Sequence, residues 1–465
     1  MAVSTQSAFE AHPEKRGRLV LVTAAPPAAA SKGEGKTSCT LALLDALRLA
    51  GASACAVLRQ PSMGISAAGA KGGASGVGAS GLKEAMEANF GLQGEMLRVG
   101  AYQNLLVGFA EKELAGEGEV LLPRASDVPT KYLRKVEAGG IKESFVLTPT
   151  GELEQIRVLS RSRSELEGSI KGITAGKLGE KFISGKDLPL ESAWPVLGPA
   201  CRISFLSTLR GSPVLMYCGP FANVSLGIPG LSALDLALSK YDFVLMEAGY
   251  GFDMGMQKYL EVASKRASAF PSAVAAVARR ESVEGPLGWR YAAGLKCIRR
   301  LGVAPVPILN VFEGQSRKAP IPGALALNPA KDGEKELLAL GKALLARLEG
   351  SRPAAKKPYR GSLPLLSRIS YVSSAFYGVS PGRVRFTRAF KASYLSALAQ
   401  AKAEGFDLDG FALNMVKSPS SLTDDDFEKF SRRTVTVRKI SLNTGSKVAN
   451  VRATLAPTAF LPRVV

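Results

Sequence analysis

A short apolar run, followed at once by a glycine-rich turn and a helix, constrains this chain more than any other feature. Residues 18–25 are mostly apolar and typical of a strand, and the turn at 31–38 reads Ser-Lys-Gly-Glu-Gly-Lys-Thr-Ser. Regularly spaced leucines over 40–50 predict an amphipathic helix, and residues 54–58 form a second apolar strand. In an open α/β sheet, ligands bind beyond the carboxyl ends of the strands. We therefore expect the turn to hold a ligand.

The chemistry of the turn suits a phosphate group. Gly33 and Gly35 allow a tight turn whose backbone N–H groups face an anion, and a helix that starts near Thr37 adds the positive end of its dipole. Lys36 would then reach the β and γ phosphates of a nucleotide, and the Thr37 hydroxyl would bind Mg²⁺. A complete pattern has glycine where this chain has Ala30. The alternative is a simple turn that opens an ordinary helix.

The loop after the second strand makes the chain resemble a known family. Arg59 ends that strand and is followed by Gln60-Pro-Ser, and a Lys-Gly-Gly-Ala run begins at Lys71. With the turn at 33–37, these segments resemble the amino-terminal motifs of formate–tetrahydrofolate ligase (formyltetrahydrofolate synthetase): Gly-Glu-Gly-Lys-Thr, Leu-Arg-Glu-Pro-Ser and Lys-Gly-Gly-Ala. Gln60 replaces the glutamate of that pattern, which removes a negative charge and any role as a base.

Three later segments continue the resemblance. Residues 219–223 read Gly-Pro-Phe-Ala-Asn, and 247–253 read Glu-Ala-Gly-Tyr-Gly-Phe-Asp, where the family has Phe in place of Tyr. Residues 417–425 are similar to the family's Lys-Thr-x-x-Ser-Leu-Ser-Asp-Asp segment. The resemblance thus spans nearly the entire chain and is strongest over 19–78, 213–259 and 411–441.

The resemblance implies a two-step reaction. ATP phosphorylates formate to formyl phosphate, and an amine of tetrahydrofolate then attacks the formyl carbon, which gives 10-formyltetrahydrofolate. It implies catalytic roles for Lys36, Arg59 and Lys71, with Arg59 binding formyl phosphate and Thr37 binding the metal. ATP and Mg²⁺ are the expected cofactors, with tetrahydrofolate, as its polyglutamate, the co-substrate. The residues expected to contact them are Gly33, Glu34, Gly35, Lys36, Thr37, Ser38, Gly72, Gly73, Glu95, Asn223, Glu247 and Phe312.

Several positions depart from the family. Leu97 and Gln103 stand where it has histidines, and Pro329 stands where it has a tryptophan that pairs with a phenylalanine on the pterin ring. Phe312 matches that phenylalanine, but the same position suits a core residue at the end of a strand. These departures leave a second hypothesis open: a non-catalytic or repurposed homologue that binds nucleotide and acts as a partner or polyanion-binding protein.

The strand and helix signals predict an α/β fold of the phosphate-loop type. We expect a mostly parallel sheet flanked by helices, with smaller α/β domains toward the C-terminus. The expected domains are 1–260, with a variable insert at about 116–200, then 261–350 and 351–465, the last after a polar linker. A hairpin is expected at 434–451. The helical residues 83–114 have as core candidates Met86, Phe90, Leu105, Leu106 and Phe109.

Composition narrows the classes of partner. The net charge of +20 over 465 residues favours polyanionic partners, but a solvated basic surface without a specific partner is the preferred explanation. A nucleic-acid partner is left open, without a recognised RNA-binding signature. A single histidine, His12, argues against imidazole-based zinc chemistry, and the five cysteines lack metal-ligand spacing.

The sequence also bears on location and assembly. No apolar run is long enough to span a bilayer, and scattered cysteines suit a reducing compartment. We expect a cytoplasmic protein, with a mitochondrial address left open. The resemblance implies a homo-oligomer.

Overall fold

The structure is a computed structural model that describes residues 3–10, 17–26, 33–61, 64–66, 69–71, 75–89, 94–127, 135–138, 141–220, 224–351, 363–418 and 421–454. Among the helices within these ranges, none is both long enough and apolar enough to cross a membrane.

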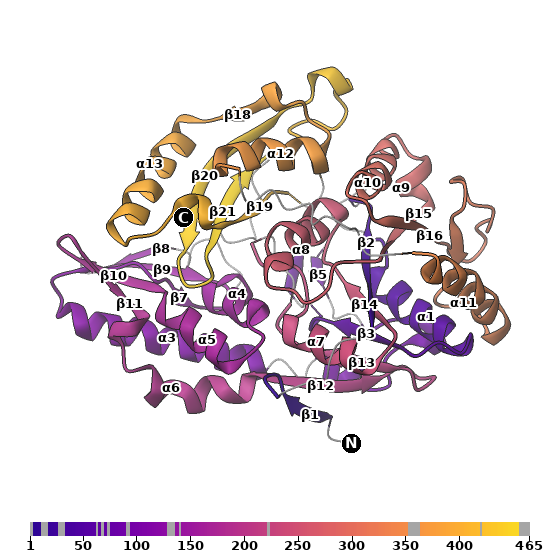
Figure 1. The fold of residues 1–465 in the computed structure, drawn as a ribbon, viewed down its shortest axis with the longest axis horizontal. Coiled ribbons are helices and arrows are strands. Elements are labelled where there is room, and N and C mark those ends of the chain that lie inside the picture. Colours follow the sequence, from indigo (N-terminus) through magenta and orange to yellow (C-terminus); the bar gives the residue numbers. More distant parts are fainter. Residues whose placement is uncertain are drawn as a thin grey trace.

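A nine-stranded sheet forms the centre of the molecule (Figure 1). Its strands run parallel from β13 to β17, while β1 and β12 add an antiparallel edge. The predicted α/β fold with a mostly parallel sheet flanked by helices is confirmed. In spatial order the strands are β1 (Ser4–Ser7), β12 (Arg202–Ser207), β13 (Pro213–Met216), β3 (Ala54–Leu58), β14 (Phe243–Glu247), β2 (Arg18–Ala24), β15 (Ala273–Arg279), β16 (Ala304–Asn310) and β17 (Leu325–Leu327).

Both faces of the sheet are buried, which explains why its strands are apolar throughout. Along β2, Leu19 and Leu21 pack into one core, and Val20 and Val22 pack into the other. The second core holds α1 (Lys36–Leu49) and α11 (Glu334–Glu349). The first core holds α7 (Leu231–Lys240), α8 (Gln257–Glu261) and α10 (Trp289–Arg300). The helix α1 is therefore held firmly against the sheet, at the end of β2.

A separate core supports the segment between β5 (Gly69–Lys71) and β12. It is built on helices and two small three-stranded sheets, β11-β10-β6 and β7-β9-β8; β5 itself pairs with β4 (Gly64–Ser66). The helices are α3 (Gly94–Leu114), α4 (Glu152–Leu159), α5 (Arg163–Lys171) and α6 (Leu190–Leu197), and the strands are β6 (Glu119–Val120), β7 (Arg124–Ala125), β8 (Lys135–Ala138), β9 (Ile141–Val146), β10 (Thr174–Leu178) and β11 (Lys181–Ser184). The short helix α2 (Ala85–Asn89) lies in the same segment, but its buried Ala88 packs into the second core of the central sheet.

Part of the core prediction for 83–114 is wrong. Met86 is 68% exposed and Leu105 is 38% exposed, whereas Leu106 is buried and Phe109 is half-buried. The buried positions of α3 recur every three or four residues on the face that includes Leu106, so the adjacent Leu105 points outward. Phe90 lies outside the described residues.

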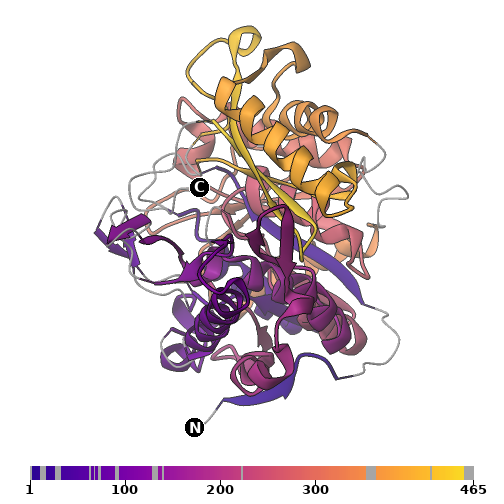
Figure 2. The ribbon, with the colours of Figure 1, turned by 90° about the vertical axis from the view of Figure 1, so that its left-hand side faces the viewer.

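The C-terminal residues form a smaller α/β unit, at the top of both ribbon views (Figures 1 and 2). Its sheet has the order β18-β20-β21-β19, and β20 and β21 form the predicted antiparallel hairpin. Strands β15, β16 and β17, which fall within the expected domain 261–350, belong to the central sheet. The division of the chain into domains stays a prediction. The elements are α12 (Leu365–Tyr377), β18 (Val384–Phe386), α13 (Arg388–Ala403), β19 (Ala412–Val416), β20 (Val435–Asn443) and β21 (Val448–Ala453).

Candidate active site

The turn before α1 is fixed by the ends of two neighbouring strands. The Glu34 carboxylate accepts hydrogen bonds from the Arg279 backbone N–H and the Ser282 hydroxyl, both at 2.7 Å. The Glu34 carbonyl accepts one from the Asn310 amide at 2.9 Å. Gly35 has φ +79°, and a Cβ added there would lie 2.3 Å from the Asn310 amide nitrogen. Glycine is favoured at this position, because a Cβ would add the strain of left-handed backbone and would displace the Asn310 amide.

The Glu34 carboxylate therefore forms its hydrogen bonds within the protein. Burial raises the pKa of its carboxyl group, and the hydrogen bonds from Ser282 and Arg279 oppose that rise. The carboxylate holds the turn against the ends of β15 and β16. Its predicted contact with a substrate stays a prediction.

The metal-binding residue expected from the sequence lies against a second predicted site residue. The Thr37 hydroxyl donates to Glu247, with its Oγ1 3.2 Å from Oε1 and 3.0 Å from Oε2. Glu247 is the last residue of β14, which pairs with β2, so two adjacent strand ends bring the pair together. Hydroxyl and carboxylate oxygens are the donors that Mg²⁺ prefers. This pair therefore fits the ion.

The remaining residues of the turn surround this pair. Gly33 is exposed, and Lys36 and Ser38 are half-buried in the first turn of α1. Within the described ranges, no group of three or more His, Cys, Asp or Glu side chains could hold a metal ion by itself.

Arg59 lies just beyond β3, on the other side of β14. Its side chain is fully buried and pairs with Glu154, with NH2 3.4 Å from Oε1. Its Nε donates to the Gly219 carbonyl, and NH2 donates to the Pro220 carbonyl at 3.2 Å. Burial lowers the pKa of Arg59, and the Glu154 carboxylate opposes that change. The guanidinium is thereby fixed at the carboxyl edge of the sheet.

Glu154 belongs to a larger buried cluster. Its Oε2 accepts from Arg157 Nε at 2.8 Å, and its Oε1 accepts from the Gly219 N–H at 2.6 Å. Arg157 NH1 lies 3.4 Å from Glu95 Oε2, which also accepts from the Gln60 amide at 3.2 Å. Burial raises the pKa of Glu95 to about 7, although Arg157 opposes the rise. Two predicted site residues, Arg59 and Glu95, therefore meet in one network.

The sequence reasoning missed Glu154 and Arg157. Both lie on α4, whose other buried residues include Leu153, Ile156 and Val158. The available signal was an acid and a base three residues apart, in a helix that also carries Leu153, Ile156, Val158 and Leu159. Such a pair faces one side of a helix and is rarely buried unless it is bonded.

Strained backbone marks the same edge. Cys218 follows β13 with φ +70°, and Tyr250 follows β14 with φ +58°. Non-glycine residues in this left-handed region cost about 1–3 kcal/mol each and gather at functional sites. Burial raises the pKa of Tyr250 to about 12, and the charge of Arg59 opposes that rise.

The aromatic residue expected for the pterin ring lies beyond β16. Phe312 is 43% exposed, so it is not a core residue. The Arg279 guanidinium lies over its ring, 4.5 Å from the centroid. The carbonyl oxygen of Pro329 lies close to Gly78, at 2.5 Å from the position that a Cβ added to that glycine would take. The exposed face at Phe312 therefore has an arginine beside it.

Other predicted positions differ in their surroundings. Leu97 is 71% exposed, whereas Gln103 is buried and donates to the Pro123 carbonyl at 2.6 Å. Lys71 is the last residue of β5. Gly72, Gly73 and Asn223 lie outside the described residues.

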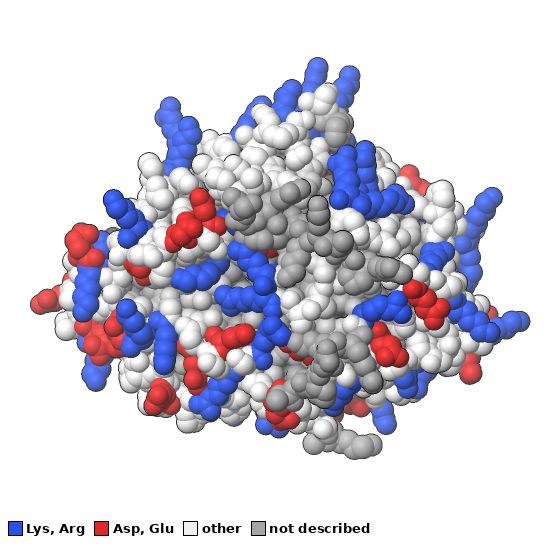
Figure 3. Space-filling view, viewed as in Figure 1, with Lys and Arg blue, Asp and Glu red and all other residues white. Residues whose placement is uncertain are grey.

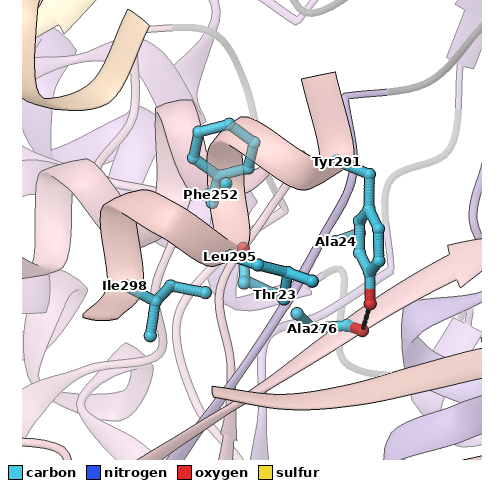
Figure 4. A pocket seen from close by; sticks show the side chains of 8 residues that line it. Thr23, Ala24, Phe252, Ala276, Tyr291, Leu295 and Ile298 are labelled. Carbon is cyan, nitrogen blue, oxygen red and sulfur yellow. Dashed lines mark hydrogen bonds between the residues drawn. The ribbon is translucent and has the colours of Figure 1, made fainter. Parts of the chain in front are cut away.

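A small apolar pocket lies near the end of β2, but it does not coincide with this site (Figure 4). Its lining comes from β2, β15, α10 and the π-helical turn at Phe252–Met256. The Tyr291 hydroxyl donates to the Ala276 carbonyl at 2.6 Å. A Cβ on Gly294 would meet the Phe252 ring at 2.5 Å, so α10 approaches that turn closely. This region is packing that supports the strand ends.

Comparison with known proteins agrees with the geometry. The family model "Formate--tetrahydrofolate ligase" matches residues 2–285. Proteins of that name are similar along most of the chain. The Bifidobacterium longum protein is 38% identical over 97% of this chain and 94% of its own length. Those of Staphylococcus carnosus and Thermotoga maritima are each 28% identical, over 93% and 88% of this chain and 84% and 81% of their own lengths. This chain belongs to the formate–tetrahydrofolate ligase family.

Proposed function

We propose that this chain joins formate to tetrahydrofolate at the expense of ATP, through formyl phosphate, to give 10-formyltetrahydrofolate. One observation supports this most: the phosphate turn, Glu247 and Arg59 lie at the carboxyl ends of β2, β14 and β3, which are three consecutive strands of the sheet. Parallel strands point their carboxyl ends to one edge. A nucleotide phosphate and a small anion bound there would be neighbours.

In the first step, a formate oxygen attacks the γ phosphorus of ATP, and ADP leaves. Phosphoryl transfer depends mainly on positioning and on neutralising charge. The N–H groups of the turn and the Lys36 ammonium would hold the phosphates, and Thr37 with Glu247 would hold Mg²⁺. The ion supplies neutralisation of the negative charge on the phosphate oxygens.

In the second step, the amine of tetrahydrofolate attacks the formyl carbon. A C–N bond forms, the C–O bond to phosphate breaks, the electron pair leaves with phosphate, and the amine releases its proton. Arg59 would neutralise the departing phosphate. The exposed ring of Phe312, with Arg279 against it, offers a flat surface for the pterin, where stacking contributes about 1 kcal/mol.

The basic surface suits the acidic tail of a folate polyglutamate. The net charge is +20, and Lys and Arg side chains are spread over the face in Figure 3, with several at its upper end, over β18 and β20. Such a field attracts anions and weakens with salt. We also expect a homo-oligomer in the cytoplasm, which size-exclusion chromatography with light scattering and fractionation would test.

The test is formation of 10-formyltetrahydrofolate from ATP, formate and tetrahydrofolate by the wild type, by Lys36→Ala and by Lys342→Ala. Lys342 is an exposed lysine on α11, far from the turn in sequence. The proposal predicts product from the wild type and from Lys342→Ala, with at least a hundredfold loss in Lys36→Ala. Nucleotide binding without product in the wild type would reject the ligase and favour a nucleotide-binding partner protein.

A further inference from the structure

We propose that Glu154 and Arg157 are positioning residues, which hold Arg59 in the orientation that its anionic substrate requires. This inference rests on the proposed function and extends it to residues outside the recognised motifs. Both act through Arg59, and neither is assigned a contact with substrate.

Arg157 fixes the carboxylate of Glu154 in a fork. Its Nε lies 2.8 Å from Oε2, and its NH2 lies 3.2 Å from Oε1. The third nitrogen, NH1, donates to the Ala200 carbonyl at 2.5 Å. Two-point bonds of this kind set the plane of a carboxylate as well as its place. Both side chains are buried, so water does not compete for these bonds.

Glu154 then connects two strand ends. Its Oε1 accepts from the Gly219 N–H at 2.6 Å and lies 3.4 Å from Arg59 NH2. Arg59 in turn donates to the carbonyls of Gly219 and Pro220. The segment after β13 and the arginine after β3 are thus held to each other directly and also through one carboxylate oxygen of Glu154.

Charge explains why a second arginine is present. Arg59 and Arg157 supply two positive charges, and Glu154 supplies one negative charge. A buried pair of Arg59 and Glu154 alone would carry no net charge, which would weaken its attraction for an anion. With Arg157 the cluster keeps one positive charge at the edge of the sheet, as long as Glu95 is protonated.

The geometry also makes a stability role a poor explanation. Burying charges carries a desolvation penalty that their attraction only partly recovers, so apolar residues would serve stability as well. Glu154 and Arg157 lie in α4, where Leu153, Ile156, Val158 and Leu159 are buried beside them. Their placement beside Arg59 points to orientation of that side chain instead.

The experiment compares Glu154→Gln and Arg157→Lys with a control pair on the surface. Glutamine keeps the size and one acceptor oxygen but removes the charge, and lysine keeps the charge but removes the fork. The control is Arg163→Lys and Glu167→Gln, a 2.7 Å ion pair on α5 with exposed side chains. Readouts are kcat, the KM for formate, the KM for ATP, and the Kd of MgADP measured by calorimetry.

We expect each cluster variant to lose at least tenfold in kcat/KM for formate, with the Kd of MgADP within twofold of wild type. The control pair should match wild type in every readout. A structural role would weaken nucleotide binding in parallel, because the whole sheet edge would be disturbed, and that result would overturn the proposal.

Arg157→Lys keeps the test decisive even where Glu154→Gln fails to fold. An Arg157→Lys enzyme with wild-type kcat and KM for formate would overturn the proposal, because the fork would then be unnecessary. Failure of the underlying function looks different: the wild type itself would make no 10-formyltetrahydrofolate.

Discussion

Gly35→Ala tests how the phosphate turn is held. The substitution places a Cβ 2.3 Å from the Asn310 amide nitrogen, at a residue with φ +79°. Left-handed backbone costs about 1–2 kcal/mol for alanine, and displacing Asn310 from the Glu34 carbonyl loses a hydrogen bond worth about 1 kcal/mol. The sum is about 2–3 kcal/mol. If the turn of the variant relaxes in the absence of nucleotide, binding must restore its conformation, and this cost is subtracted from the binding free energy. Binding of MgADP then weakens roughly 30- to 150-fold.

Calorimetry with MgADP is the assay, and Gly51→Ala is the control. Gly51 lies just beyond the other end of α1 with φ +89°, and a Cβ there would meet no atom of the described residues within 4 Å. Both variants should lose stability to the same backbone strain, but only Gly35→Ala should lose affinity. Affinity of Gly35→Ala within twofold of wild type would refute the reasoning, as would an equal loss in Gly51→Ala.

Three further predictions follow from burial and charge. Glu261 is fully buried, and neither oxygen has a hydrogen-bond partner among the described residues; burial raises its pKa from 4.5 to about 8. The folded state therefore holds an extra proton between these values, so stability falls as pH rises through that window, by on the order of 3–5 kcal/mol. Glu261→Gln should remove this slope in urea unfolding at pH 5 and pH 8.5, and Glu180→Gln, 99% exposed, should not. Glu95 has a pKa of about 7, so the KM for formate should rise above pH 7 as its carboxylate cancels the positive charge of the cluster, and Glu95→Gln should make that KM independent of pH. Phe312→Ala should raise the KM for tetrahydrofolate about fivefold and leave the KM for ATP unchanged in steady-state assays.

Each of these has a clear contrary result. An unchanged pH slope in Glu261→Gln would show that another group dominates the linkage. A KM for formate that still rises above pH 7 in Glu95→Gln would assign the titration elsewhere. An equal rise in the KM for ATP in Phe312→Ala would mean that the substitution disturbs the turn, since Asn310 lies two residues away.

Much of the central sheet was predictable because its signals are local. The strand Ala54–Leu58 and the start of α1 follow from uninterrupted apolar runs, a glycine-rich turn and leucine spacing. The hairpin of β20 and β21 likewise follows from its turn residues. Order along the sheet then places Thr37 beside Glu247, because β2 and β14 end at the same edge.

Only some residues of the cluster at Arg59 could be predicted, because the cluster is formed by contacts between residues that are far apart in the sequence. Arg59 and Glu95 stand in recognisable motifs, but Glu154 and Arg157 come from α4, some 95 residues beyond Arg59 in the chain. A charged pair on a helix usually faces solvent, and only the fold brings this one under the strand ends. The prediction that Leu105 is a core residue is wrong for a related reason, because apolar character alone does not tell which face of α3 is buried.

The most direct test of the central claim is to supply formate labelled with ¹⁸O, together with ATP and tetrahydrofolate, and to measure the label in the released phosphate. The proposed path passes one formate oxygen to phosphorus in the first step and leaves it there when the C–O bond breaks in the second. It therefore predicts phosphate with one ¹⁸O for each 10-formyltetrahydrofolate formed. Unlabelled phosphate, or no product at all, would contradict the account.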